Sequence, residues 1–570
     1  METHGNRNAD GGGGAPGFGN GLPNPRNGVP GGGSSVPGRA AGSGPGDGTG
    51  APAPTASAGS APSAGSSAAP VAAHPPVVGL AVSQRMYLPA GGGAQDLHAI
   101  LTVRVEGVSG IEGADPGGAA PAPSLAEVLV VDCSASMKAP EKKIRAARQA
   151  AVTALKALPD GTPFAVVKGT HRAETVYPPS GPMRPASAQT RAEAERAVYA
   201  MMAGGGTCVG NWLSLAGELL AEQGAPIPHV LMLTDGRNEH DDRNPLAGVL
   251  DTWQGRFVCD AWGIGREWDA RLLVRVTSRL HGSAYAVREE SELPSAYDDL
   301  ITGLLAKSLP ELEIRVLISP GTRLRYLRQM FPTEGNPPQT EDGRAIAFTT
   351  RAWGNEVRRY QLCLTVDPAG RELGEDLQAA LVEVAVPGAP PGSPAGSVSP
   401  GSLSVRLPPA QPCVVQWTDD PVLARTANEE VDHFAKHRQL GDTVALAADA
   451  FRLGRRNEAV TLLGVAVSLA HELGAQTQLA ELQRIVEIRD PAAGHVVLRD
   501  GVQQIDFEYL ITMSTHTTQG PTADGRPAGG VTVQPVAGLT DCPNCHVRVP
   551  STAKFCPNCR HLLAPRVEAP

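Results

Sequence analysis

Apolar residues follow two patterns between residue 125 and about residue 308 of this chain. Continuous apolar runs, as at 126–132 and 229–235, are typical of buried strands. Between them, segments such as 139–158 and 268–280 have apolar residues at helical spacing, with Lys and Arg on the opposite face of the first. Strands that alternate with helices predict a doubly wound α/β fold, in which a mostly parallel sheet is covered by helices on both faces.

Other patterns occur on either side of this α/β region. Residues 77–107 have the alternating apolar positions of two strands, and 311–418 contain further strand-like segments separated by Gly/Pro turns. A β-sandwich-like region is expected here, and the two N-terminal strands can join it, which would make the α/β region an insertion. Residues 441–474 have the periodicity of a helical hairpin, and 494–512 suggest two more short strands.

Composition separates the expected folded regions from the rest. The N-terminal segment consists mainly of Gly, Pro, Ala, Ser and Asn, so it cannot bury enough apolar surface to become ordered. The expected boundaries are a disordered tail at 1–76, flanking strands at 77–107, the α/β domain at 124–308, the β-rich region at 309–419, a helical region at 420–490, short strands and a linker at 491–540, and a cysteine-rich module at 541–563.

Charge, hydropathy and cysteine spacing argue against a nucleic-acid-binding, membrane-spanning or secreted protein. The formal net charge of −9 and the lack of a basic run argue against nucleic acid as the main partner. No apolar stretch approaches the length of about 18 residues that a membrane-spanning helix needs. The N-terminal segment has no apolar core of a secretory signal, and most of the nine cysteines are scattered singly. A soluble, cytoplasmic protein without a disulfide framework is therefore expected.

The apolar run 126–132 ends in a turn with three oxygen-bearing side chains, Asp132, Ser134 and Ser136. This D-x-S-x-S spacing puts one carboxylate and two hydroxyls at the tip of a buried strand. Such hard oxygen ligands suit a hard divalent cation such as Mg²⁺. Asp and Ser are also common turn and helix-capping residues, so a structural cap is the alternative interpretation.

Two distant segments offer matching ligands. Thr207 lies on a Gly-rich loop just before a predicted helix, and Asp235 ends the apolar run 229–235. In a parallel sheet the carboxyl ends of the strands meet at one edge, so Asp132 and Asp235 are expected to face one crevice. Three hydroxyls and two carboxylates suit an octahedral Mg²⁺ that keeps some water and leaves one position open.

These five positions resemble the metal-ion-dependent adhesion site of the von Willebrand factor A-type domain, which combines D-x-S-x-S with a Thr on a second loop and an Asp on a third. The resemblance implies that Mg²⁺ or another divalent cation is held there, with the two carboxylates acting partly through water. It also implies that an Asp or Glu of a partner protein fills the open metal position.

Further segments resemble a mainly actinobacterial subfamily of von Willebrand A proteins that is linked to tellurium resistance and stress response. They are GGGTCVGNWL, LMLTDGRNE, GIGREWD, QWTDD and the helical region, within roughly 78–515. The resemblance implies β-rich and helical regions after the A domain. The GREWD turn departs from the expected G-x-D-W pattern because Asp269 follows Trp268, which leaves the role of this turn open.

Four cysteines near the C-terminus form the pattern C-x2-C-x10-C-x2-C. Two thiolate pairs on two tight turns make a tetrahedral S₄ site, the preferred geometry of structural Zn²⁺. A redox C-x-x-C more often occurs singly beside a βαβ unit. A zinc ribbon that binds protein or serves as a tethered module is expected, with the ligands Cys542, Cys545, Cys556 and Cys559.

Other residues of metal-binding type have simpler interpretations. His240, Asp241 and Asp242 follow Asp235 closely, and a solvated loop is expected there rather than a second metal site. His433 and His437 have the four-residue spacing of zinc ligands on a helix, but the Glu and the third ligand of a metalloprotease are missing. These two histidines are expected on a surface face of the helix.

The sequence contains no frame typical of an enzyme. There is no phosphate-binding P-loop, no nucleophile elbow and no recognisable pair of catalytic carboxylates. The leading hypothesis is a non-enzymatic, Mg²⁺-dependent module that captures an acidic group of a partner protein. The subfamily resemblance implies a role in a stress or metal-resistance system. The alternative is the A-domain subunit of a chelatase-like AAA ATPase that remodels proteins or inserts metal.

Overall fold

The computed structural model describes most of the chain beyond the N-terminal segment. The described residues are 75–108, 125–138, 142–265, 267–288, 291, 293–307, 309–342, 345–368, 372–387, 405–519, 539–544, 548–550, 556, 561 and 563. Residues 1–74 of the predicted disordered tail lie outside the described residues, as do 109–124, 388–404 and 520–538.

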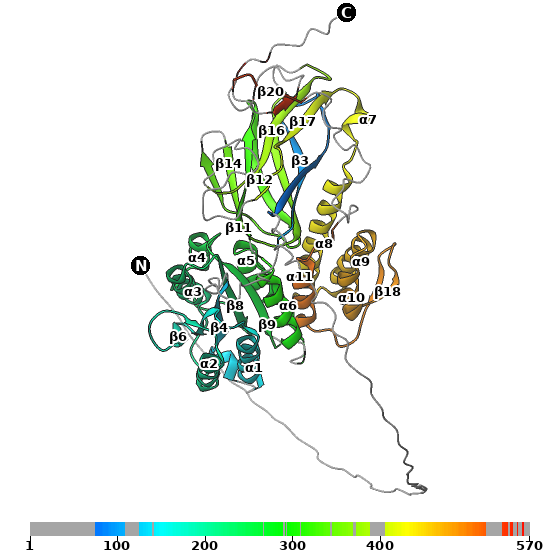
Figure 1. Cartoon of the computed structure of the whole chain (residues 1–570). Coiled ribbons are helices and arrows are strands. Elements are labelled where there is room, and N and C mark those ends of the chain that lie inside the picture. Colours follow the sequence, from blue (N-terminus) through cyan, green and yellow to red (C-terminus); the bar gives the residue numbers. More distant parts are fainter. Residues whose placement is uncertain are drawn as a thin grey trace, which may run out of the picture. The chain divides into compact units, whose positions relative to one another are not determined.

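The α/β region contains a seven-stranded sheet in the order β10-β9-β8-β4-β5-β6, with β7 paired to β5 (Figure 1). The pairings from β10 to β5 are parallel, and β6 and β7 run antiparallel to β5. The strands are β4 (Leu125–Asp132), β5 (Pro163–Gly169), β6 (Ala173–Tyr177), β7 (Arg184–Pro185), β8 (Ile227–Thr234), β9 (Val258–Ile264) and β10 (Ala284–Val287). The carboxyl ends of β4 and β8 are therefore neighbours at one edge of the sheet.

Helices cover both faces of this sheet because its central strand is apolar on both sides. Val128 and Val130 of β4 belong to one hydrophobic cluster, with residues of α3, α4 and α5. Leu129 and Val131 belong to another, with residues of α1, α2 and α6. The bounds are η1 (Ala135–Lys138), α1 (Lys142–Ala157), α2 (Ala188–Ala200), α3 (Val209–Gln223), α4 (Leu246–Trp253), α5 (Ala270–Arg279) and α6 (Leu293–Leu305). The α/β fold predicted from the sequence is thus confirmed, as a mixed sheet with antiparallel strands at one edge.

Two further sheets share one hydrophobic core and form a β-sandwich. Their orders are β1-β3-β15-β12 and β13-β14-β11-β16-β17-β2. The bounds are β1 (Val77–Gln84), β2 (Tyr87–Pro89), β3 (Gln95–Glu106), β11 (Leu309–Ile318), β12 (Thr322–Phe331), β13 (Gln339–Asp342), β14 (Ala345–Trp353), β15 (Glu356–Val366), β16 (Asp376–Ala385) and β17 (Gln411–Thr418). Because β3 pairs with β15 along its whole length, the α/β region is inserted into the sandwich.

The region after the sandwich is mainly helical. It contains α7 (Pro421–Ala424), α8 (Glu429–Arg452), α9 (Arg456–Glu472), α10 (Gln476–Ile485), the hairpin of β18 (Val486–Asp490) and β19 (His495–Leu498), and α11 (Gln504–Ser514). The short pair β20 (Leu539–Asp541) and β21 (Arg548–Pro550) follows. No helix among the described residues has both the length and the apolar character needed to cross a bilayer.

Residues 504–512 are helical, which corrects the prediction of a second short strand there. Their apolar run is buried on several sides, since Phe507, Tyr509, Leu510 and Ile511 all belong to the cluster that includes α3 to α5 and α8 to α10. The alternation of apolar and acidic residues at 505–509 has the period of a strand, and the packing of the helix against several elements overrides this local pattern.

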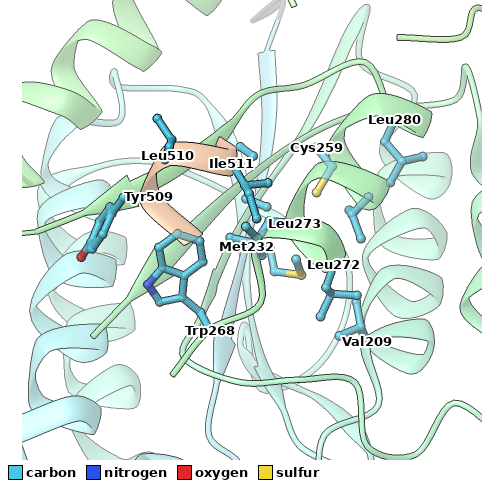
Figure 2. Packing of buried hydrophobic residues seen from close by; sticks show 14 of the residues in the cluster. Val209, Met232, Cys259, Trp268, Leu272, Leu273, Leu280, Tyr509, Leu510 and Ile511 are labelled. Atoms are coloured by element: carbon cyan, nitrogen blue, oxygen red, sulfur yellow. The ribbon is translucent and has the colours of Figure 1, made fainter. Parts of the chain in front are cut away.

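Helix α11 lies against the α/β region at the start of α5 (Figure 2). Figure 2 shows Trp268 beside Tyr509, with Leu510 and Ile511 next to them. The carboxylate of Glu508 also accepts a hydrogen bond of 3.0 Å from the backbone N–H of Ala270, the first residue of α5. The helical region is therefore joined to the α/β region by apolar and polar contacts.

A second correction concerns His433 and His437 of α8. His437 is 1% exposed, and its Nε2 atom lies 2.7 Å from Oγ1 of Thr518 and accepts the Thr518 N–H. Nε2 of His433 is 3.1 Å from the same Oγ1 atom. Burial, and then the charge of His433, lower the pKa of His437 to about 4. The pair does not form a surface face but instead fixes the segment that follows α11.

A buried charge cluster lies near the amino ends of the central strands. His229 of β8 places Nδ1 2.7 Å from Oε2 of Glu127 on β4 and Nε2 2.8 Å from Oδ2 of Asp260 on β9. Burial acts against the charged imidazole, but the two carboxylates outweigh it and raise the pKa of His229 to about 10. His229 is therefore an imidazolium held between two carboxylates, near the amino ends of the strands and far from Asp132 at the carboxyl end of β4.

Candidate metal-binding site

Asp132 is the last residue of β4 and is fully buried. Its Oδ1 atom accepts a hydrogen bond of 2.8 Å from the backbone N–H of Ser134, and its Oδ2 atom accepts one of 2.6 Å from Oγ1 of Thr234. The first contact closes the turn after the strand, and the second links this turn to the end of β8. Thr234 was not singled out from the sequence, because a Thr within an apolar strand gives no sign of this contact.

A chain of hydroxyl contacts connects the turn to Asp235. The Oγ atoms of Ser134 and Ser136 are 2.8 Å apart, and Oγ of Ser136 donates to Oδ1 of Asp235 at 2.9 Å. Ser134 and Asp235 are buried, and Ser136 is half-buried. Four of the five predicted ligands therefore form one connected group.

Thr207 joins this group from the Gly-rich loop. A Cβ atom on Gly236 would lie 3.4 Å from Oδ2 of Asp132, 3.6 Å from Oγ of Ser136 and 3.7 Å from Oγ1 of Thr207. Three predicted ligand oxygens thus surround one point beside the backbone of Gly236. The structure brings all five predicted residues together, although they come from three separate loops.

Backbone hydrogen bonds fix the Gly-rich loop against the Asp132 turn. Ala135 N–H donates to the carbonyl of Gly205 at 2.8 Å, and Gly204 N–H donates to that of Cys133 at 2.7 Å. Gly205 has φ +87°, a left-handed conformation that favours glycine. Burial raises the pKa of the Cys133 thiol to about 12, so Cys133 packs as a small apolar residue.

Two imidazole rings, those of His171 and His240, cover this loop, and His240 is half-buried there, which corrects the solvated position expected for it. A Cβ on Gly205 would lie 2.5 Å from Nδ1 of His171, and one on Gly206 would lie 2.0 Å from Nε2 of His240. A larger residue at either position would displace a ring. By contrast, Asp241 and Asp242 are exposed, in agreement with the solvated loop expected from the sequence.

The electrostatics of the five residues fit a divalent cation. Burial raises the pKa of Asp132 to about 6, despite hydrogen bonds from Thr234 and Ser134 that lower it, and the charge of Asp235 raises it further. Oδ2 of Asp235 is buried and accepts no hydrogen bond from a hydroxyl or a backbone N–H. Two buried carboxylates whose charge is not balanced by such donors favour a nearby cation, because a cation stabilises their charged forms. The donor set consists of oxygen atoms alone, which suits Mg²⁺.

Lys143 of α1 reaches into this site, contrary to the solvent-facing position expected for the basic residues of that helix. Its Nζ atom lies 2.9 Å from Oδ2 of Asp235, and the side chain is 10% exposed. The same ammonium forms an ion pair with Glu267, which is mostly exposed. Among the described residues, Lys143 is the only cation in an ion pair with one of the five predicted ligands.

The GREWD turn connects the site with α5 and α11. Glu267 pairs with Lys143 on one side, while Trp268 is buried against Tyr509 on the other. Asp269 caps α5 by accepting the N–H groups of Arg271 and Leu272 at 2.9 and 3.2 Å. The shift of Asp269 past Trp268, noted in the sequence, therefore produces a helix cap.

Only part of the cysteine-rich module is described. Cys542 and Cys556 are buried in one cluster with Val549 and Leu563. Cys545 and Cys559 lie outside the described residues. Elsewhere in the described part of the chain, no group of three or more His, Cys, Asp or Glu side chains is arranged to hold a metal ion. The site around Asp132 differs from such groups because three of its five ligands are hydroxyls.

A family model of the von Willebrand factor type A domain matches residues 127–286, which include all five residues of the candidate site. A solved structure described as von Willebrand factor type A from Catenulispora acidiphila is 28% identical, with a TM-score of 0.65, over 79% of this chain and 99% of that chain. That similarity extends well beyond the α/β region.

An uncharacterized protein from Synechocystis sp. is 23% identical over 218 residues, which are 38% of this chain and 49% of that protein. The match thus spans about half the length of this curated relative. The sheet order, the residues gathered at the ends of β4 and β8, and the family match lead to one conclusion: residues 127–286 of this protein form a von Willebrand factor type A domain.

Proposed function

We propose that this A domain binds a partner protein through a divalent cation, with Mg²⁺ as the expected ion, and that the partner supplies an Asp or Glu carboxylate. Domains of this family generally mediate protein–protein interaction through such a site. The observation that carries the proposal is the arrangement of Asp132, Ser136 and Thr207 oxygens around one point beside Gly236. The Ser136 hydroxyl connects this arrangement to the buried carboxylate of Asp235.

Each residue has a defined task in this proposal. Ser134, Ser136 and Thr207 would hold the ion through their hydroxyl oxygens, and Asp132 and Asp235 would balance its charge, directly or through water. The ion would supply the positive charge that pairs with the partner's carboxylate. Thr234 keeps Asp132 in place by donating to its Oδ2 atom. The proposed function is therefore binding, with no chemical step on the partner.

The test is affinity capture of partners by the full chain with Mg²⁺ and with EDTA. Asp132→Ala removes a ligand, whereas Asp242→Ala removes an exposed carboxylate from a nearby loop and serves as the matched control. Partners that bind in Mg²⁺ to the wild type and the control, and are lost with EDTA or Asp132→Ala, support the proposal. Partners retained under all four conditions would rule it out.

The identity of the captured proteins also separates the two hypotheses for this chain. Binding partners that present acidic groups and have no ATPase activity would agree with an adhesion module. Partners that belong to a stress or metal-resistance system would support the cellular role expected from the sequence. Stable co-purification of an AAA-type ATPase, together with stimulation of its ATP hydrolysis, would instead favour the chelatase-like alternative.

We further propose that the C-terminal module holds structural Zn²⁺ through Cys542, Cys545, Cys556 and Cys559. The joint burial of Cys542 and Cys556 supports this, because these two residues come from the two different C-x-x-C pairs. Four thiolates would leave no open position for catalysis, so the metal would stabilise the fold of the module.

A further inference from the structure

Lys143 occupies an unusual place for a helix lysine. Its ammonium is 2.9 Å from Oδ2 of Asp235 and 3.5 Å from the carbonyl oxygen of Ser136, so it contacts two of the five site residues. Lys156, on the same helix, is 62% exposed and pairs only with Glu195 at 3.4 Å. The position of Lys143 is therefore specific to the site and is not a general property of α1.

We propose that Lys143 is an internal cation that competes with the divalent ion for Asp235, and that Glu267 holds the ammonium when the ion displaces it. This inference rests on the metal-dependent function proposed above. The ammonium is the close partner of Oδ2 of Asp235, whereas Oδ1 of the same carboxylate accepts the hydroxyl of Ser136. Two cations at one buried carboxylate repel each other, so binding of either weakens binding of the other.

Glu267 makes the exchange possible without leaving the ammonium unpaired. It already forms an ion pair with Lys143, and its own side chain is 67% exposed. Burial acts to lower the pKa of Lys143, but the hydrogen bonds and charges of Glu267 and Asp235 outweigh this and raise it. Lys143 therefore stays charged, and a short movement toward Glu267 would separate it from Asp235 while it keeps a partner.

The arrangement links the ion to the helical region. Glu267 is followed directly by Trp268, which is packed against Tyr509 of α11. The position of the lysine acceptor is thus fixed by a turn that is anchored outside the site. In this scheme Lys143 satisfies Asp235 when no ion is bound, and its displacement sets the affinity for the ion.

The experiment measures Mg²⁺ binding to the full chain by isothermal titration calorimetry. Lys143→Met removes the competitor and is expected to tighten Mg²⁺ binding by about tenfold or more. Glu267→Gln removes the alternative acceptor and is expected to weaken Mg²⁺ binding by about threefold. In the Lys143→Met background, the same substitution is expected to change Mg²⁺ affinity by less than about twofold. Lys143→Arg keeps the positive charge and is expected to stay within about threefold of wild type, and Lys156→Met is the control on the same helix.

A second measurement guards against a folding defect. In EDTA, Lys143→Met is expected to unfold at lower urea concentration than the wild type, because Asp235 loses its counter-charge. Saturating Mg²⁺ should supply that charge and remove the difference. Equal Mg²⁺ affinity of the wild type and Lys143→Met would overturn the inference alone. Failure of every variant to bind Mg²⁺ would overturn the proposed metal function, and the inference with it.

Discussion

Trp268 and Tyr509 pack edge to face, with ring centroids 5.3 Å apart and an interplanar angle of 83°. The guanidinium of Arg288 lies on Tyr509 as well, 3.6 Å from the ring centroid. Trp268 follows Glu267, the partner of Lys143. This aromatic pair therefore fixes the turn beside the proposed metal ligands from outside the A domain.

Tyr509→Leu is expected to lower the free energy of unfolding by about 2 kcal/mol, because it removes the edge-to-face contact and the cation–π contact while retaining an apolar side chain. Urea unfolding of the full chain measures the change. Tyr199→Leu is the matched control, because Tyr199 is 48% exposed. Equal losses of unfolding free energy in the two variants would show that the Trp268–Tyr509 contact does not contribute to stability.

The imidazolium of His229 predicts a loss of stability at alkaline pH. Its pKa is raised to about 10 in the folded protein, from an ordinary value of 6.5. The folded state then binds the proton more tightly, so the contribution is complete below about pH 6.5 and disappears as the pH rises toward 10. Unfolding free energies at pH 7 and pH 9.5 test this.

His229→Gln should lose about 3–5 kcal/mol at pH 7, because Glu127 and Asp260 remain buried without their counter-charge. In this variant, the free energy of unfolding should also decrease less between pH 7 and pH 9.5 than in the wild type. His495→Gln, at an exposed position, should behave as the wild type. An alkaline decline of the same size in His229→Gln would contradict the assignment.

The buried pair on α8 predicts the opposite dependence on pH. The pKa of His437 is lowered to about 4, so below its ordinary value of 6.5 the folded state binds fewer protons than the unfolded state. Stability is therefore lost as the pH falls from about 6.5 to about 4, by an amount on the order of 2 kcal/mol. His437→Gln keeps an acceptor for Thr518 but cannot titrate, and should reduce this acid sensitivity.

Thermal unfolding at pH 7.5 and pH 5 compares this variant with the wild type. Because burial also lowers the pKa of His281 to about 4, some acid sensitivity should remain in His437→Gln. A wild-type acid response in His437→Gln would show that the contact with Thr518 does not depend on the neutral imidazole.

Zinc content tests the proposal for the C-terminal module. The purified chain is expected to contain about one tightly held Zn²⁺ ion, and Cys542→Ser to contain almost none. Elemental analysis after dialysis against EDTA measures both. Cys413→Ala alters a buried cysteine of the sandwich core and should retain the metal. Full zinc content in Cys542→Ser would exclude the four-cysteine site.

The α/β fold and the gathering of the five site residues could be predicted from local pattern. Asp132 and Asp235 directly follow apolar runs, and the ends of neighbouring parallel strands must meet, so sequence position translated into spatial proximity. The course of 504–512 could not be predicted in this way, because its alternating apolar and acidic residues have the period of a strand, and only packing against distant elements makes the segment helical.

The sequence by itself determined which oxygen ligands occur and at which strand ends, because strand period and turn chemistry are local properties. Only the tertiary structure decided what surrounds them. Lys143 has the sequence context of a solvent-facing helix lysine, and it reaches Asp235 because α1 begins beside the carboxyl ends of β4 and β8. Tyr509 packs against Trp268 although the two residues lie far apart in the sequence. Such pairings depend on which elements pack together, and that choice reflects the burial of whole faces and not the pattern of any one segment.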